Sequence, residues 1–235
     1  MTMARHLLLR LEGPLMAFGT TAIDHRRPVQ PWPATSMLTG LLANALGWDR
    51  AEGARLERLQ ARLRWAARIE RPGEHLYDFQ TAQLSKQEVG WTTRGVVEER
   101  GGGDKSYNSP HLRDRDYRAD ASVLVALRLE PADAAPTLDE LAAALERPAR
   151  PLFLGRKGCP PAARLAAGWA DGENTAAALE TIAAQQQASW AQPALYSNEA
   201  GAIAHPDRVH QASDERRFST DVHAGTRPIF ERCAR

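Results

Sequence analysis

The apolar positions near the N-terminus change from a continuous run to a helical stripe, and so predict two different elements. Residues 5–11 contain three consecutive leucines and a fourth at Leu11. Consecutive apolar residues are typical of a strand that is covered on both faces, so we expect a central strand here. Residues 36–46 carry leucines and alanines at helical spacing and are followed by Gly47, which predicts a helix that ends at this glycine.

The next elements follow from the same reasoning. Residues 52–64 place three leucines at i, i+3 and i+7, which predicts an amphipathic helix. Residues 65–71 alternate as in a strand, and Pro72-Gly73 predicts a turn. Residues 75–80 are then expected to be the second strand of a hairpin with residues 65–71.

The second half of the pattern completes a mixed α+β order. Residues 121–129 are the clearest strand of the chain, and Thr137 is expected to cap a helix over 138–145. The final strand is expected at 151–154 or at a later position. Strand, helices, two strands, strand and helix approximate the βαββαβ order of a ferredoxin-like domain.

Residues 81–118 interrupt this order. Apolar residues are sparse there, charged residues of both signs are frequent, and Gly101-Gly102-Gly103 lies in the middle. Residues 92–97 have strand character, so the sequence alone leaves two readings open: an extended hairpin arm and a disordered surface insertion.

The C-terminal region predicts less regular structure. A helix is expected over 175–186, and residues 214–218 and 227–230 have the character of two short strands. We therefore predict two parts, a ferredoxin-like domain over 1–160 and a small irregular α/β C-terminal subdomain over 161–235.

Charge changes this picture only locally. The net charge is +1, so any site for a polyanion must arise from clustered residues. Residues 147–164 contain five basic and no acidic residues, and Gly155 and Gly158 bracket Arg156-Lys157 in the middle. Glycines allow backbone N–H groups to approach a phosphate, and the two cations supply the opposite charge. The alternative is a basic turn on a solvated surface.

Several classes of chemistry lack their motifs. The sequence has no GxxxxGK[ST], GxSxG or HExxH pattern, which argues against a P-loop, a nucleophile elbow and a zinc protease. Cys159 and Cys233 lie far apart, so we expect no structural metal and no cofactor. The sequence lacks a signal-peptide pattern and an 18-residue apolar run, which predicts a cytoplasmic protein.

Three stretches of the chain carry a family resemblance. In the first, the apolar strand over 5–11 is followed by Gly13-Pro14, Gly19, Arg27-Pro28 and a leucine-rich helix that begins at Ser36. The second stretch is Asp120-Ala121-Ser122 with the strand after it, and the third, the most specific, is Leu154-Gly155-Arg156-Lys157-Gly158-Cys159-Pro160. Together they resemble the CasD family, the RAMP-type subunit of type I-E CRISPR Cascade that holds the 5′ end of the guide RNA.

The resemblance implies a ferredoxin-like, RRM-like RAMP domain whose arm is a thumb that reaches over the guide RNA to the neighbouring backbone subunit. It implies a ribonucleoprotein role in antiviral defence. The subunit would cap the 5′ repeat-derived tag of crRNA without catalysis. It would also dock on the CasC backbone subunit, help to seat the large CasA subunit, and meet target DNA only through the complex.

Two other functions remain open. Relatives in type I-C systems are metal-independent endoribonucleases that process precursor crRNA through Tyr, Lys and His. The local candidate here, Lys105-Ser106-Tyr107, has no histidine beside the lysine. The third function is that of a protein-interaction adaptor whose basic loop binds an acidic partner.

Single-stranded RNA is held by arginines on phosphates and by aromatic or guanidinium planes under bases. We therefore predict three groups of RNA-binding residues and expect the first and third groups to lie together at one edge of the sheet. They are Arg26, Arg27 and Trp32 in the first loop (residues 12–35), Lys105 and Tyr107 in the arm, and Arg156, Lys157 and Cys159 in the Gly loop (residues 154–160).

Overall fold

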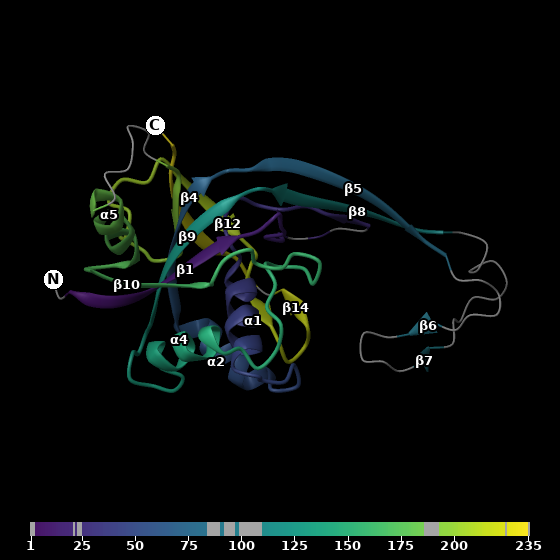
Figure 1. Cartoon of the computed structure of the whole chain (residues 1–235), viewed down its shortest axis with the longest axis horizontal. Helices are drawn as coiled ribbons and strands as arrows, with labels where there is room; N and C mark the ends of the chain where they lie inside the picture. Colours follow the sequence, from purple (N-terminus) through teal and green to yellow (C-terminus); the bar gives the residue numbers. More distant parts are fainter. Residues whose placement is uncertain are drawn as a thin grey trace.

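The computed structural model describes residues 3–20, 22, 25–83, 90–91, 97–98, 110–185, 193–223 and 225–234. These residues form a mixed α/β fold around an antiparallel seven-stranded sheet in the order β10-β1-β9-β4-β11-β15-β12 (Figure 1). Its strands are β1 (Ala4–Glu12), β4 (Leu63–Arg71), β9 (Ser122–Leu129), β10 (Ala166–Gly172), β11 (Leu195–Ser197), β12 (Arg208–Ala212) and β15 (Arg227–Arg232).

Helices cover both faces of this sheet (Figure 1). The helices α1 (Thr35–Ala45), α2 (Gly53–Arg62) and α4 (Leu138–Glu146) pack on one face, and α5 (Thr175–Gln185) packs on the other. In β1, Leu7, Leu9 and Leu11 enter the first core and Leu8 enters the second. The consecutive leucines therefore indicate a strand with two buried faces, and the prediction of a central strand is confirmed.

Most predicted elements are present within a residue or two of their expected bounds. Thr137 caps α4 as expected: its hydroxyl accepts a hydrogen bond from the backbone N–H of Glu140, whose carboxylate in turn accepts from the N–H of Thr137. Residues 151–154 form no strand, and the strand that follows α4 is β10.

The expected hairpin between residues 65–71 and 75–80 is wrong. β4 pairs with β9 and β11, whereas β5 (Glu74–Ala82) pairs with β8 (His111–Ala119). The chain leaves the sheet at Gly73, where φ is +64° and a Cβ would lie 2.3 Å from the carbonyl oxygen of Ala119. The Pro72-Gly73 turn therefore redirects the chain into another sheet and does not fold it back on β4.

β5 and β8 form a long antiparallel ribbon that extends away from the main sheet (Figure 1). This is the predicted arm, and its paired strands begin at residue 74, earlier than expected. At the root of the arm, β2 (Leu15–Met16) and β3 (Arg26–Arg27) pair with β8 on the side opposite β5. Further along the chain, β6 (Gly90–Trp91) pairs with β7 (Val97–Glu98). The predicted site residues Lys105 and Tyr107 lie outside the described residues.

The C-terminal part continues the same sheet. β11 pairs with β4 and with β15, and β15 pairs with β12, so no boundary between sheets exists near residue 160. The two predicted short strands are present as β15 and as β13 (Arg216–Arg217), which pairs with β14 (Val222–His223) in a separate small hairpin. In the part of the chain that the structure describes, no helix is long and apolar enough to cross a membrane.

Candidate nucleic-acid interface

The first loop and the Gly loop lie against each other, as expected. The backbone N–H of Ala17 donates to the carbonyl of Leu154 at 3.0 Å, and that of Ala162 donates to Glu12 at 2.8 Å. Gly13 approaches the carbonyl oxygen of Pro160 so closely that a Cβ would lie 2.7 Å from it. Two basic segments that are more than a hundred residues apart in sequence thus form one surface.

Arg156 joins these two loops to the arm. Its guanidinium donates to the carbonyl of Asp116 at 2.8 Å and to that of Arg27 at 2.9 Å. It also lies over the ring of Tyr117, 4.7 Å from the centroid. Arg156 is therefore a structural connection between the Gly loop, β3 and β8, a role that the sequence alone did not reveal. Its contact with a phosphate stays a prediction.

Three other predicted cations point to solvent. Arg26, Arg27 and Lys157 are exposed. Arg26 lies 3.7 Å from the carboxylate of Asp116, with 62% of its side chain exposed, whereas Arg27 and Lys157 form no ion pair with any described residue. Arg27 and Lys157 therefore keep their charge available for a ligand, whereas Arg26, opposite Asp114 in the register, lies on the other face of β3.

The Gly loop holds Lys157 at the tip of a tight turn. The N–H of Cys159 donates to the carbonyl of Arg156 at 2.9 Å, and the N–H of Leu154 donates to that of Cys159 at 2.7 Å. A Cβ added to Gly158, the next residue, would meet no heavy atom within 4 Å. The space beside Lys157 is therefore open to a ligand.

The remaining two predicted residues are buried. Cys159 is 0% exposed, and burial raises the pKa of its thiol. Trp32 is 8% exposed and packs against the rings of Tyr196 and His210, with centroids 4.8 and 4.9 Å away. In this structure both side chains belong to the core, and a role in RNA binding for either stays a prediction.

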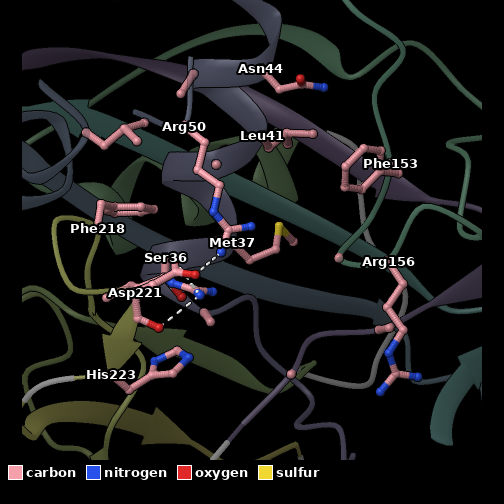
Figure 2. A pocket seen from close by; sticks show the side chains of 18 of the residues that line it. Ser36, Met37, Leu41, Asn44, Arg50, Phe153, Arg156, Phe218, Asp221 and His223 are labelled. Atoms are coloured by element: carbon pink, nitrogen blue, oxygen red, sulfur yellow. Dashed lines mark hydrogen bonds and ion pairs between the residues drawn. The ribbon is translucent and has the colours of Figure 1, made fainter. Parts of the chain in front are cut away.

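A groove of about 600 Å³ opens between the first loop, α1, the Gly loop and the β13–β14 hairpin (Figure 2). Its apolar lining includes Met37, Leu41, Trp48, Phe153 and Phe218. Of the described residues that line it, two are acidic, Asp49 and Asp221, and five are arginines: Arg27, Arg50, Arg150, Arg156 and Arg216. Phe153 and Phe218 are partly exposed, and arginines beside such aromatic rings suit single-stranded RNA.

Sequence reasoning missed Arg50, Arg216 and Phe218 as parts of this site. They come from the connection between α1 and α2 and from the C-terminal hairpin, where no local motif surrounds them. Arg216 stands beside Arg217, but no local pattern marks Arg50, which lies between Asp49 and Glu52.

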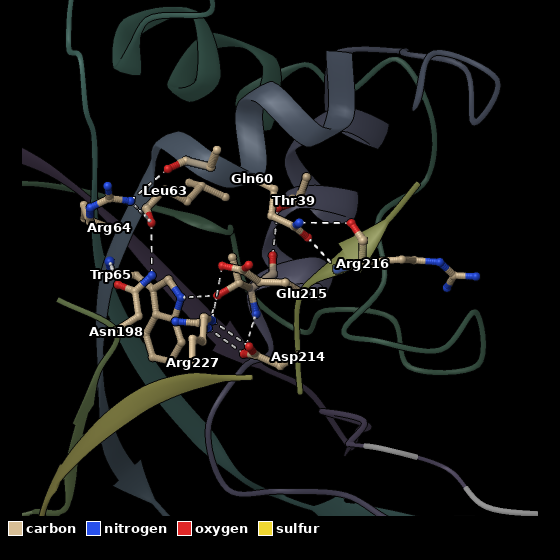
Figure 3. Close-up of polar contacts among 12 residues, drawn as sticks. Thr39, Gln60, Leu63, Arg64, Trp65, Asn198, Asp214, Glu215, Arg216 and Arg227 are labelled. Atoms are coloured by element: carbon tan, nitrogen blue, oxygen red, sulfur yellow. Dashed lines mark hydrogen bonds and ion pairs between the residues drawn. The ribbon is translucent and has the colours of Figure 1, made fainter. Parts of the chain in front are cut away.

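The hairpin wall of the groove is anchored to the helices (Figure 3). Asp214 accepts a hydrogen bond from the N–H of Thr35 at 2.9 Å and so caps α1 from the far end of the chain. Arg227 donates to both carboxylate oxygens of Asp214 at 2.7 and 2.6 Å. Gln60 of α2 exchanges two hydrogen bonds, both 3.0 Å, with the backbone of Arg216. The groove walls are therefore held at defined positions.

The basic surface continues along one face of the arm. The registers of β3 and β5 on β8 place Arg27, Arg113 and Arg115 on the same face, because directly opposed residues share a face. The other face carries Tyr77 and Phe79, which are 54% and 55% exposed. Among the described residues, no group of three or more His, Cys, Asp or Glu residues could hold a metal ion.

Comparison with known proteins identifies the class of protein to which this chain belongs. A family model described as "CRISPR-associated protein (Cas_Cas5)" matches residues 6–230. The fold and its basic groove therefore belong to a CRISPR-associated protein. More narrowly, the chain is a member of the Cas5 family.

Individual relatives agree with this assignment and with the expected resemblance to CasD. The chain is 33% identical over 158 residues to the "CRISPR system Cascade subunit CasD" of Escherichia coli (strain K12), covering 67% of this chain and 68% of that protein. A "CRISPR RNA-guided surveillance complex" chain matches with a TM-score of 0.67 at 23% identity, over 97% of this chain and 89% of that one. A structure titled "Crystal structure of Cas protein" matches with a TM-score of 0.55 at 25% identity, over 97% and 92% of the two chains.

Proposed function

We propose that this chain is a non-catalytic guide-RNA-binding subunit of a type I-E CRISPR interference complex and that it caps the 5′ repeat-derived tag of crRNA. The observation that carries the proposal is the continuous basic surface formed by the first loop, the Gly loop and the groove. Its membership of the Cas5 family and its likeness to a Cascade subunit support the same role.

We assign the first part of the sheet to a ferredoxin-like, RAMP-type unit. Its elements occur in the order β1, α1 with α2, β4, β9, α4 and β10, and its strands lie in the order β10-β1-β9-β4. This is a βαββαβ unit with the arm inserted between its second and third strands. The unit extends through β10, and residues 173–232 supply α5 and three further strands of the sheet.

In this proposal the arm faces two neighbours. Arg27, Arg113 and Arg115 on one face suit an RNA backbone, because arginine forks bind phosphates in a bidentate manner. The exposed Tyr77 and Phe79 on the other face suit a protein surface. The expected neighbours are the CasC backbone subunit and the CasA large subunit, and the expected location is the cytoplasm.

The alternative function is that of a metal-independent endoribonuclease. Cleavage through the 2′-OH of the RNA needs a general base and a proton donor within hydrogen-bond reach of the reacting atoms. Apart from His223 of the β13–β14 hairpin, the basic residues that the structure describes in the groove and the Gly loop are arginines and Lys157. Their side chains suit phosphate binding better than proton transfer. We therefore favour binding without catalysis.

One experiment separates these functions. Purified protein is incubated in EDTA with a repeat-containing precursor RNA, and binding and cleavage are followed in the same sample. Retention of the 5′ tag without product, weakened by Lys157→Ala and unchanged by Arg58→Ala on the outer surface of α2, is the expected result. A discrete cut in the repeat would establish the endonuclease. Failure to bind RNA, both alone and with CasC, would overturn the RNA-binding function and favour the adaptor.

A further inference from the structure

A carboxylate lies between two arginines inside the groove. One carboxylate oxygen of Asp221 pairs with a guanidinium nitrogen of Arg50, and the other lies 2.7 Å from a guanidinium nitrogen of Arg216 (Figure 2). The same Arg216 nitrogen donates to the backbone carbonyl of Asp221 at 3.0 Å. Arg50 and Arg216 come from different walls, so Asp221 connects the two sides of the groove.

The three side chains are accessible to solvent. Their exposed fractions are 62% for Arg50, 30% for Arg216 and 47% for Asp221. Exposed ion pairs contribute little to the stability of a fold, because both charges are well solvated when they separate. The contact can therefore open at low cost, and a competing anion can reach both guanidinium groups.

The backbone at Asp221 is unusual for a residue with a side chain. Asp221 lies in the turn between β13 and β14 with φ at +65°, in the left-handed region, which aspartate tolerates better than most residues but which still favours glycine. This conformation brings the carboxylate into the groove. Conformations of this kind concentrate at ligand-binding segments.

The surroundings suit a nucleotide. A phosphodiester of an RNA backbone carries one negative charge on two non-bridging oxygens, as a carboxylate does, and so can bind the same pair of guanidinium forks. Phe218 and Met37 line the groove beside the arginines and offer apolar surface for a base or sugar. The other acidic residue of the lining, Asp49, already accepts a hydrogen bond from the N–H of Ala51 at 2.8 Å.

We propose that Arg50 and Arg216 form a phosphate-binding site for single-stranded RNA, which the carboxylate of Asp221 fills when RNA is absent. The proposal rests on the RNA-binding function proposed above and adds a site to it. A phosphate of the RNA backbone displaces Asp221, so the aspartate competes with RNA and lowers its affinity for the groove. Partial burial acts to raise the pKa of Asp221, but the Arg50 hydrogen bond and the two guanidinium charges hold it below its usual value, so the competitor is ionised at neutral pH.

The test measures binding of a fluorescent single-stranded RNA at several salt concentrations. Asp221→Asn keeps the shape of the side chain and tolerates the positive φ but removes the charge. We expect this variant to bind RNA about three- to tenfold more tightly and to show a steeper salt dependence, since the groove without the aspartate carries one more net positive charge. Asp221→Gly removes the competitor and suits the turn, and should show the same gain. The matched control is Asp139→Asn: Asp139 is an exposed aspartate of α4 that pairs with Arg5 of β1. This variant should change neither the affinity for RNA nor its salt dependence.

The arginines provide the reverse test. Arg50→Gln and Arg216→Gln should each weaken RNA binding and lower the salt slope by about one. In the Arg50→Gln background, Asp221→Asn should give less than its full gain, because the two residues act on the same site. Unchanged or weaker RNA binding by both Asp221 variants, with the wild type still binding RNA, would overturn this site alone. Absence of RNA binding by the wild type, with CasC present, would overturn the RNA function and this site together.

Discussion

The α-carbon of Gly155 lies against the carbonyl oxygen of Ala17 with no room for a side chain. A Cβ on Gly155 would lie 2.0 Å from that oxygen, and φ of Gly155 is +94°. Glycine is the residue that both the close approach and the backbone conformation require. This contact lets the Gly loop pack on the first loop and brings the cations of the two loops together.

Replacing Gly155 should therefore separate the two loops. We expect Gly155→Ala to destabilise the protein by about 3 kcal/mol, because it adds both a steric clash and a strained φ. Urea unfolding would measure this change. Gly158→Ala is the matched control in the same loop: its φ is not in the left-handed region and its Cβ would meet no heavy atom within 4 Å. An equal effect of the two substitutions would contradict the role of the Gly155–Ala17 contact.

The buried ion pair between Asp214 and Arg227 predicts a second large effect on the stability of the fold. Asp214→Ala removes the buried carboxylate partner of the Arg227 guanidinium, whose side chain is 14% exposed, and also the cap of α1. Only the more exposed Glu215, 3.5 Å away, then remains to pair with Arg227. We expect a loss of about 3–5 kcal/mol in the free energy of unfolding. Asp139→Ala breaks an ion pair whose side chains are 51% and 72% exposed and should change stability little. Similar losses from the two variants would show that Asp214 is not a special anchor.

Glu199 predicts a pH-dependent contribution to stability. Burial acts to raise its pKa, but hydrogen bonds from Arg128 and Thr175 outweigh this and lower the pKa below its ordinary value. A carboxylate with a lowered folded-state pKa stabilises the fold above its unfolded-state pKa of about 4.3, and this stabilisation is lost as pH falls through the folded-state value.

Glu199→Gln should therefore be less stable than the wild type at pH 7 by about 1 kcal/mol, since charge-assisted hydrogen bonds become neutral ones. The difference should shrink as the pH falls below about 4. Urea unfolding across this range would measure it, with the exposed Glu146→Gln as the control. A difference that stayed constant with pH would show that the ionised form is not what stabilises the fold.

Replacing the two cations of the Gly loop, Arg156 and Lys157, should have different effects on stability. Lys157→Ala removes an exposed charge, so we expect weaker RNA binding, a salt slope smaller by about one, and unchanged stability. Arg156→Ala also removes two hydrogen bonds and the contact with Tyr117, so we expect an additional loss of stability of about 1–3 kcal/mol. Anisotropy with labelled RNA and thermal unfolding separate the two effects. Equal stability of both variants would show that Arg156 does not hold the loops together.

The periodic elements could be predicted from the sequence because their signals are local. The leucine run of β1 indicated two covered faces, and Thr137 with Glu140 formed the capping box that its spacing allows. These features depend on neighbours within four residues, and the fold leaves them unchanged.

Strand pairing could not be predicted in the same way. Residues 65–71 and 75–80 are adjacent in sequence and separated by a turn signal, which favours a hairpin. The close approach of Gly73 to Ala119 instead sends the second strand into the arm, where β8 is its partner. Such a partner, more than thirty residues away, leaves no trace in a local pattern.

The full set of residues in the groove could not be predicted from local sequence patterns either. The cations of the first loop and the Gly loop lie in local clusters that the sequence shows. Arg50 and Arg216 can be recognised as parts of one site only in the folded protein, where α1 and the C-terminal hairpin line the same groove. Sequence reasoning also assigned Trp32 and Cys159 to binding by their place in these loops, and the structure places both side chains in the core.

The position of β15 within the sheet has a consequence for synthesis. Strands β10, β1, β9 and β4 are all available once residue 172 has left the ribosome. β15 ends at Arg232 and lies between β11 and β12, so the other half of the sheet forms only after β15 has been made. The hairpin that forms one wall of the groove lies between β12 and β15 in sequence. A nascent chain can therefore fold its first four strands early, whereas the groove is completed only after β15 has been made.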